Sequence, residues 1–198
     1  MLKPIVELEE AIARLPGFGK RSARRAALAI VKEPTRLADP LIAALGIARE
    51  RVCCCQKCGA FTTVDERVCA MCTDPLRDSS IVCVVEEPSD IIQLESSGAY
   101  KGLYHSLGGK IAPSRRTGPE NIRIRELIER VKKEGFHEVF LALSTDMEGD
   151  ATANYIAELL IPYHVKVSRL AFGLPIDSGV AYSDPLTLKR AINSRSYV

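Results

Sequence analysis

The sequence predicts a mixed α/β protein in several parts, in which a helical module and a four-cysteine segment precede a mainly parallel sheet with flanking helices. Three observations lead to this fold class. The first fifty residues have helical periodicity, six of the seven cysteines lie between positions 53 and 72, and short apolar strands then alternate with helices. The 198 residues are 46% hydrophobic and 26% charged, an ordinary globular composition that excludes wholesale disorder and a coiled-coil rod.

The N-terminal module is predicted to contain three helices. Apolar residues recur at steps of three and four over residues 1–15: Ile5, Leu8, Ile12 and Leu15. The glycine-rich turn 16–19 ends this helix, and an alanine- and arginine-rich helix follows over residues 22–32 until Pro34. Asp39-Pro40 is suited to begin the third helix, whose apolar side would carry Leu37, Leu41 and Leu45.

The part of the chain after the cysteines alternates between strand and helix. Wholly apolar runs are typical of strands buried on both faces of a parallel sheet. The strands are expected at residues 81–85, 103–107, 139–143 and 165–170. The helices are expected at residues 88–97, 119–134 and 151–161. This alternation indicates a parallel sheet with helices packed on it.

The turn at Pro16-Gly17-Phe18-Gly19 has the composition of a phosphate-binding element. Glycines let the backbone approach a ligand closely, and the free amides at the start of the next helix attract anions. Residues 14–36 also hold seven basic residues against one acid. A plain turn between packed helices with a solvated basic face is the alternative, but the combination resembles a helix-hairpin-helix DNA-binding motif. The candidate DNA-binding residues are Gly17, Gly19, Lys20, Arg21, Arg24 and Arg25.

The cysteines predict a structural zinc site. Cys55-x-x-Cys58 and Cys69-x-x-Cys72 would each present two thiolates to one tetrahedral ion, which leaves no open coordination position for catalysis. We therefore expect one structural zinc ion per chain. Cys54 could compete with Cys55, and the symmetrical spacing favours Cys55.

Acidic residues follow two of the expected strands. Glu86 comes after the strand at 81–85, and Asp146, Glu148 and Asp150 come after the strand at 139–143. The carboxyl ends of parallel strands meet at one edge, where open α/β sheets bind ligands. One hypothesis is a magnesium site for phosphoryl transfer, since Mg²⁺ binds a few carboxylates and water. The alternative is a solvated acidic rim in which one aspartate caps a helix.

These acidic segments resemble the Toprim fold of topoisomerases and primases. Those enzymes carry a glutamate after the first strand and an Asp-x-Asp pair after a later strand. Glu86 matches the glutamate and Asp146 matches the second aspartate, whereas Ser144 stands in the place of the first. Because one carboxylate is missing, the resemblance does not imply the catalysis of those enzymes.

The order of the three motifs over essentially the whole chain resembles the RecR family of bacterial recombination mediators. Further matching segments are Leu15-Pro16-Gly17-Phe18-Gly19 and the runs at 84–88, 102–109, 148–155 and 169–175. The resemblance implies a protein without enzymatic activity that works with RecO, and in some pathways RecF, to load RecA at single-stranded gaps in DNA. Family members form rings, often tetramers, that encircle duplex DNA.

The resemblance also implies roles for the parts of the chain. The residues expected to bind RecO are Glu86, Asp146, Glu148 and Asp150. The expected domains are the helix-hairpin-helix module at 1–52, the zinc finger at 53–76, the Toprim-like domain at 77–172 and an oligomerisation segment at 173–198. A magnesium-dependent nuclease or primase-like enzyme remains the competing hypothesis, and a zinc-stabilised clamp without repair partners is a third. Without a signal-peptide core or a long apolar run, we expect a soluble cytoplasmic protein.

Overall fold

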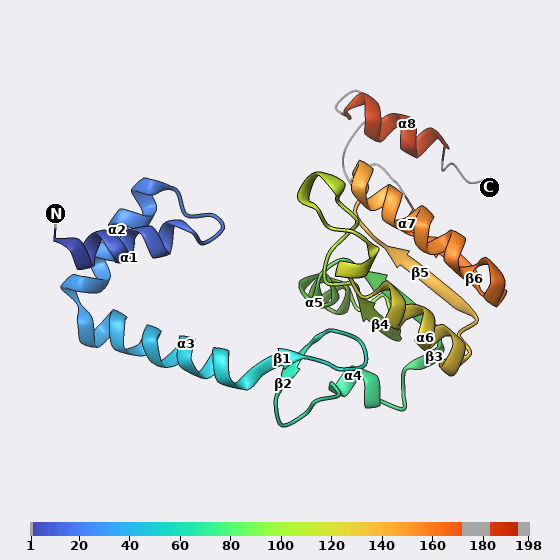
Figure 1. Ribbon diagram of the computed structural model, residues 1–198, viewed down its shortest axis with the longest axis horizontal. Helices are drawn as coiled ribbons and strands as arrows, with labels where there is room; N and C mark the ends of the chain where they lie inside the picture. Colours follow the sequence, from blue (N-terminus) through green and yellow to red (C-terminus); the bar gives the residue numbers. More distant parts are fainter. Residues whose placement is uncertain (1, 172–182, 194–198) are drawn as a thin grey trace. The chain divides into compact units, whose positions relative to one another are not determined.

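The computed structural model describes residues 2–171 and 183–193, and these form two compact units, Met1–Val52 and Cys53–Val198 (Figure 1). Each unit is considered by itself. Of the expected oligomerisation segment 173–198, only helix α8 (Pro185–Asn193) and the two residues before it are described. No helix in the described part of the chain is both long enough and apolar enough to cross a bilayer.

The first unit is entirely helical. Its elements are α1 (Lys3–Ala13), α2 (Lys20–Lys32), the π-helical turn η1 (Pro34–Ala38) and α3 (Asp39–Arg51). Helices α1 and α2 pack through a small core of Ile12, Ala23 and Ala27. Helix α3 begins at Asp39 as expected, but Asp39 is its first helical residue and not its N-cap, because the chain is already helical from Pro34 onward. Helix α3 buries no residue within the unit, so its apolar side is exposed.

The second unit begins with the cysteine segment and continues into a four-stranded parallel sheet. Two short strands and a short helix carry the cysteines: β1 (Val52–Cys54), β2 (Phe61–Thr63) and α4 (Ala70–Thr73). The sheet has the order β4-β3-β5-β6, and every described pairing in it is parallel. Its elements are β3 (Asp78–Val85), α5 (Pro88–Ser97), β4 (Gly102–Ser106), α6 (Ile124–Glu134), β5 (Glu138–Ala142), α7 (Met147–Leu160) and β6 (Lys166–Arg169).

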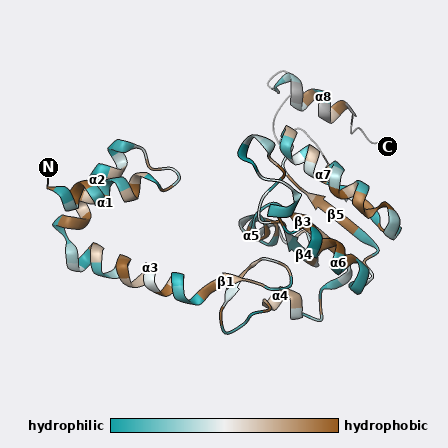
Figure 2. Cartoon of the chain, viewed as in Figure 1, coloured by the Kyte–Doolittle hydropathy of each residue, from teal (hydrophilic) through white to brown (hydrophobic). Residues whose placement is uncertain are grey.

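The two faces of this sheet are covered by different parts of the chain. Successive side chains of a strand point to opposite faces. Val82 and Val84 of β3 therefore pack in the core beneath α6 and α7, whereas Cys83 and Val85 pack with Tyr104, α5 and the cysteine segment. Figure 2 shows β5 as predominantly hydrophobic, as expected for a strand covered on both faces. The cysteine segment is thus part of the packing of the sheet.

Two helix boundaries differ from those expected. Helix α6 begins at Ile124 instead of residue 119, because the backbone N–H of Arg123 donates a 2.9 Å hydrogen bond to the carbonyl of Leu107. That bond ties the preceding residues to the sheet, and only a 3₁₀ turn forms over Pro119–Asn121. Helix α7 begins at Met147, four residues earlier than expected, because Asp146 caps it.

A buried arginine and histidine join β4 to α6. The guanidinium of Arg130 donates to the carbonyl of Tyr104 at 2.7 Å and to Nδ1 of His105 at 3.3 Å. Nε2 of His105 lies 2.8 Å from the carbonyl of Arg123, to which it donates. His105 is therefore held as the neutral tautomer with its proton on Nε2, and burial lowers its pKa to about 3.

This histidine predicts acid sensitivity of the fold. Below about pH 6.5 the unfolded chain binds a proton at His105 that the folded chain does not accept, so stability falls as the pH decreases toward 3. His105 lowers the free energy of unfolding by about 1.4 kcal/mol for each pH unit within that window. Between pH 7 and pH 4, the melting temperature of His105→Gln should decrease less steeply with falling pH than that of the parent. His137→Gln, at an exposed histidine, serves as the matched control and should leave the slope unchanged.

Candidate functional site

The hairpin between α1 and α2 is an open turn at the start of a basic helix. Gly17 has φ +83°, a conformation that favours glycine, and the backbone N–H of Phe18 closes the turn onto the carbonyl of Leu15 at 3.2 Å. Gly19 is the N-cap of α2 and supplies no side chain to cap it. The first amides of α2 are consequently available to an anion at the positive end of the helix.

The basic residues of α2 that are expected to bind DNA are all exposed. They are Lys20, Arg21, Arg24 and Arg25. Within the described residues none of the four forms an ion pair, so their charges are free to meet a polyanion. Phosphate groups of a nucleic-acid backbone fit this arrangement, because backbone contacts use basic side chains and helix N-termini.

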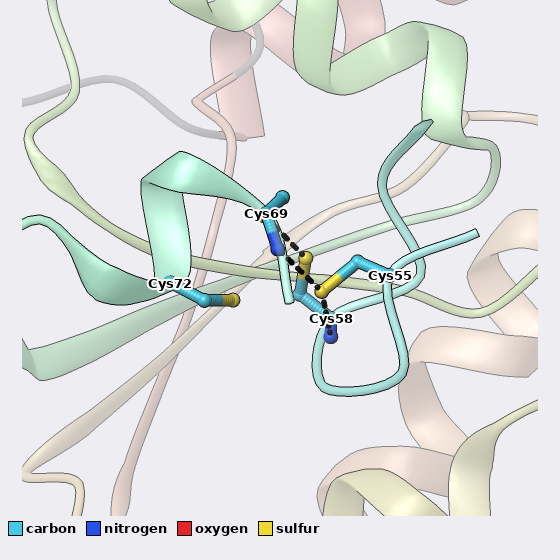
Figure 3. A group of neighbouring side chains, drawn as sticks. All are labelled: Cys55, Cys58, Cys69 and Cys72. Carbon is cyan, nitrogen blue, oxygen red and sulfur yellow. Dashed lines mark hydrogen bonds between the residues drawn. The ribbon is translucent and has the colours of Figure 1, made fainter. Parts of the chain in front are cut away.

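The four cysteines chosen from the sequence come together in the second unit (Figure 3). The sulfur atoms of Cys55, Cys58, Cys69 and Cys72 all lie within 4.8 Å of one another. Tetrahedral zinc with Zn–S bonds of about 2.3 Å separates its sulfur ligands by about 3.8 Å, so one ion fits among them. Cys54 is exposed and lies outside the cluster, which supports the choice of Cys55.

Backbone amides surround the cysteine cluster in the manner of a metal site. The N–H groups of Cys58 and Cys69 point to Sγ of Cys55 at 3.5 and 3.3 Å, and the N–H of Ala60 points to Sγ of Cys58 at 3.4 Å. Such contacts stabilise thiolates. Hydrogen bonds from the neighbouring thiols of Cys58 and Cys72 lower the pKa of Cys69. The residues present can hold one metal ion with no coordination position left open.

The cysteine cluster is attached directly to the end of β4. The carbonyl of Cys58 accepts a 2.7 Å hydrogen bond from the N–H of Ser106, the last residue of that strand. Arg123 reaches from the start of α6 to the carbonyls of Gln56 and Lys57 at 3.2 and 3.4 Å. The cysteine segment and the carboxyl edge of the sheet are therefore joined by hydrogen bonds.

The acidic residues meet at the carboxyl edge of the sheet as expected. Glu86 follows β3, and one of its carboxylate oxygens accepts a 2.6 Å hydrogen bond from the N–H of Ser144, which follows β5. Asp146 caps α7 by accepting from the N–H of Gly149 at 2.7 Å. A side chain at position 149 would collide with Ser144, since its Cβ would lie 2.2 Å from the Ser144 carbonyl.

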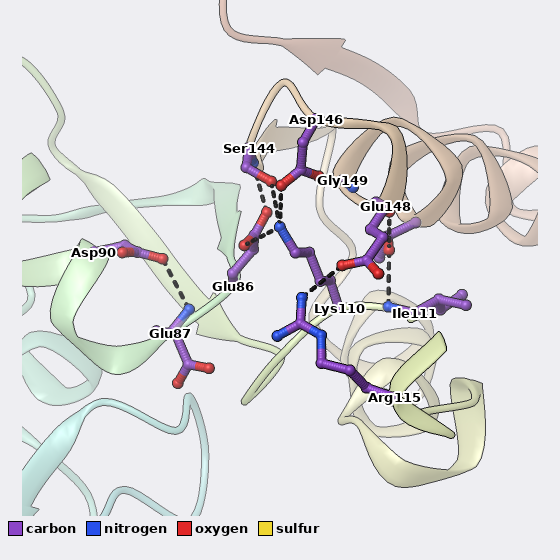
Figure 4. Close-up of polar contacts among 11 residues, drawn as sticks. Glu86, Glu87, Asp90, Lys110, Ile111, Arg115, Ser144, Asp146, Glu148 and Gly149 are labelled. Carbon is purple, nitrogen blue, oxygen red and sulfur yellow. Dashed lines mark hydrogen bonds and ion pairs between the residues drawn. The ribbon is translucent and has the colours of Figure 1, made fainter. Parts of the chain in front are cut away.

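Lys110, which is not among the predicted site residues, lies among these acids (Figure 4). Nζ of Lys110 is 3.0 Å from the hydroxyl of Ser144 and 3.6 Å from a carboxylate oxygen of Glu86, and it also donates to Asp146. Hydrogen bonding to Asp146 raises the pKa of Lys110, and the same bond lowers the pKa of Asp146 to about 2. The ammonium of Lys110 and the carboxylate of Asp146 are thus both charged across the physiological range.

The other two acids are also paired with bases. Glu148 accepts from Arg115 at 2.6 Å and from the hydroxyl of Ser114 at 3.1 Å, which lowers its pKa. Asp150 accepts from Arg169 at 2.7 Å. The carboxyl edge is thus a surface of paired charges. Residues 110–133, which hold eight basic residues against three acids, contribute Lys110 and Arg115 to it.

One sequence rule could have found Lys110. It follows β4 in the loop after Gly108 and Gly109, and β4 ends at the same edge as β3 and β5. The rule that brought Glu86 and Asp146 together therefore applies equally to this lysine. Arg123 had no such signal, because its partners are backbone carbonyls in another segment.

Comparisons with known proteins agree with both units. A family model described as RecR, helix-hairpin-helix matches residues 5–49, and one described as Toprim domain matches residues 80–171. Recombination protein RecR of Moorella thermoacetica is 45% identical over 193 residues, which cover 98% of this chain and 96% of the relative. Recombination protein RecR of Desulfatibacillum aliphaticivorans is 44% identical over 96% of this chain and 95% of the relative. That of Cutibacterium acnes is 43% identical over 98% of this chain and 96% of the relative. The chain belongs to the RecR family of recombination proteins.

Proposed function

We propose that this protein is a DNA-binding recombination mediator without enzymatic activity, which acts in the cytoplasm with RecO, and with RecF in some pathways, to load RecA at single-stranded gaps. The observation that carries the proposal is the open hairpin followed by four exposed, unpaired bases of α2. These groups contact phosphates and read no base sequence, as a protein that acts at any gap requires. The DNA-binding residues are Gly17, Gly19, Lys20, Arg21, Arg24 and Arg25.

Zinc is the metal that we assign to the cysteine cluster. Four thiolates with tetrahedral spacing suit Zn²⁺, and a site saturated by protein ligands is structural. One ion held by Cys55, Cys58, Cys69 and Cys72 would fix the segment that packs on the sheet.

The carboxyl edge of the sheet is our candidate for the RecO-binding surface. Its acids are Glu86, Asp146, Glu148 and Asp150, and a hollow of about 360 Å³ beside them is lined by Glu86, Glu87, Lys110 and Arg115 among others. Fixed charges of both signs determine how two partners are oriented at an interface, and they make the interface specific. RecO would meet a patterned surface, since each of the four acids has a basic partner.

Self-association into a ring, with a tetramer as the favoured size, is also part of the proposal. Helix α3 exposes several large apolar side chains within its unit, as an element that packs against another copy would. They are Leu41, Ile42, Leu45 and Ile47.

The mediator role is tested by RecA loading on single-stranded DNA coated with single-strand-binding protein. The full chain with RecO should accelerate the onset of RecA's DNA-dependent ATP hydrolysis. Asp146→Asn combined with Glu148→Gln removes two charges with little change of shape, and we expect about 10-fold weaker RecO binding and slower loading. Glu120→Gln with Glu129→Gln, at exposed acids elsewhere on this unit, is the matched control. Loading that is independent of the added chain would refute the proposal.

A further inference from the structure

We propose that Lys110 is a tethered cation that takes the place of a divalent metal ion among the Toprim carboxylates, so that this site does not bind Mg²⁺. The Toprim resemblance places a metal between the glutamate after the first strand and the aspartates after a later one. In this chain the ammonium of Lys110 occupies that position, with Glu86, Ser144 and Asp146 as its partners (Figure 4).

The carboxylate oxygens that a metal would need are already engaged. One oxygen of Glu86 accepts from the N–H of Ser144 at 2.6 Å, and the other faces Lys110 at 3.6 Å. One oxygen of Asp146 accepts from the N–H of Gly149 at 2.7 Å, and the other accepts from Lys110. Mg²⁺ demands near-octahedral oxygen ligands at about 2.0–2.1 Å, and a positive ammonium at the centre repels it. The residues present therefore do not fit the ion.

The backbone on both sides of Lys110 is fixed to the site. The N–H of Gly109 donates to the carbonyl of Glu86 at 2.9 Å. The N–H of Ile111 donates at 2.9 Å to the hydroxyl of Thr152, a fully buried side chain of α7 that itself donates to the carbonyl of Glu148 at 2.7 Å. The side chain of Lys110 is only 15% exposed. The ammonium is therefore held in place before any ligand arrives.

The charge at the site is consistent with a substitution of lysine for metal. Three carboxylates around a divalent ion leave one net negative charge. Glu86 and Asp146 around the single charge of Lys110 leave the same net charge. Ser144, in the place of the remaining aspartate, accepts a hydrogen bond from the ammonium without adding charge. The absence of one aspartate and the presence of the lysine thus compensate each other, and the net charge of the site stays the same.

Manganese binding to the full chain tests this assignment, with Mn²⁺ as a paramagnetic stand-in for Mg²⁺ detected by electron paramagnetic resonance. The parent should bind Mn²⁺ no more tightly than Glu86→Gln does. Lys110→Ala frees the position between the carboxylates, and we expect at least a 10-fold gain in Mn²⁺ affinity that Lys110→Ala with Glu86→Gln abolishes. Lys110→Arg retains a tethered cation and should behave as the parent.

Two results would overturn the assignment. One is Mn²⁺ binding by the parent that is clearly tighter than that of Glu86→Gln, because the metal would then displace the lysine. The other is a folded Lys110→Ala variant, as judged by its circular dichroism, that gains no affinity. The comparison of the parent with Glu86→Gln remains decisive if Lys110→Ala does not fold. Neither measurement involves DNA or RecO, so the result is independent of the mediator role.

Discussion

Loss of metal from the cysteine cluster is expected to have the largest effect on stability. Binding of a structural zinc ion to four thiolates contributes on the order of 10 kcal/mol to folding. In this protein Cys55, Cys58 and Cys69 also pack with Val85 and Tyr104 on one face of the sheet. Cys55→Ser should therefore lower the melting temperature by more than about 10 °C, and a strong chelator should do the same to the parent.

Metal content and thermal unfolding measured on the same samples check this expectation. The parent should carry one zinc ion per chain and Cys55→Ser much less. Cys54→Ser is the matched control, since that neighbouring thiol is exposed and outside the cluster, and it should keep both metal and stability. A parent with far less than one zinc per chain, or a Cys54→Ser variant that loses its metal, would contradict the ligand assignment.

Charge reversal on the hairpin helix is expected to have the largest effect on DNA binding. Lys20→Glu with Arg24→Glu removes two exposed bases and places two negative charges beside the open amides of α2. We expect at least a ~100-fold loss of affinity at about 0.1 M salt, and a dependence of log K on log salt that is shallower by about 2. Neither side chain is buried, so the melting temperature should stay within a few degrees of the parent.

Fluorescence anisotropy with a labelled duplex, repeated over a range of salt concentrations, measures both quantities. Lys3→Glu with Arg49→Glu changes the net charge of the same unit equally at exposed positions outside the hairpin and α2, and it should cost far less affinity. Equal losses in the two double variants would mean that overall charge, and not the hairpin, binds DNA. An unchanged affinity in the hairpin variant would refute the site itself.

Local sequence patterns were sufficient to predict most of the elements of the fold. Apolar runs predicted the strands of the parallel sheet, and α5 and α6 end at the expected residues 97 and 134, each followed by a glycine in the left-handed conformation, Gly98 and Gly135. The start of α6 escaped prediction because a hydrogen bond from Arg123 to a distant carbonyl determines it. The exposure of α3 escaped as well, since periodicity indicates an apolar side but not what covers it.

In the candidate sites, too, local sequence patterns predicted some features and missed those that depend on distant contacts. The spacing of the cysteines predicted a cluster in which all four sulfurs converge, because two short turns determine the positions of two thiols each. The spacing of residues did not predict in this way that basic residues pair with the acids at the carboxyl edge of the sheet. Lys110 is distant in sequence from Glu86 and Asp146, and the three side chains meet because β3 pairs with β4 and β5, whose carboxyl ends lie at one edge of the sheet.

The central claim, that this protein holds DNA without cutting it, is tested most directly by a gel assay with end-labelled gapped DNA. The assay is run at low salt, with magnesium present and absent, and it reports retention and strand integrity together. The account predicts DNA that is shifted and intact under both conditions, because basic side chains bind the phosphates and Lys110 fills the position of a catalytic metal. Magnesium-dependent nicking that disappears in Glu86→Gln would contradict it and establish a Toprim enzyme.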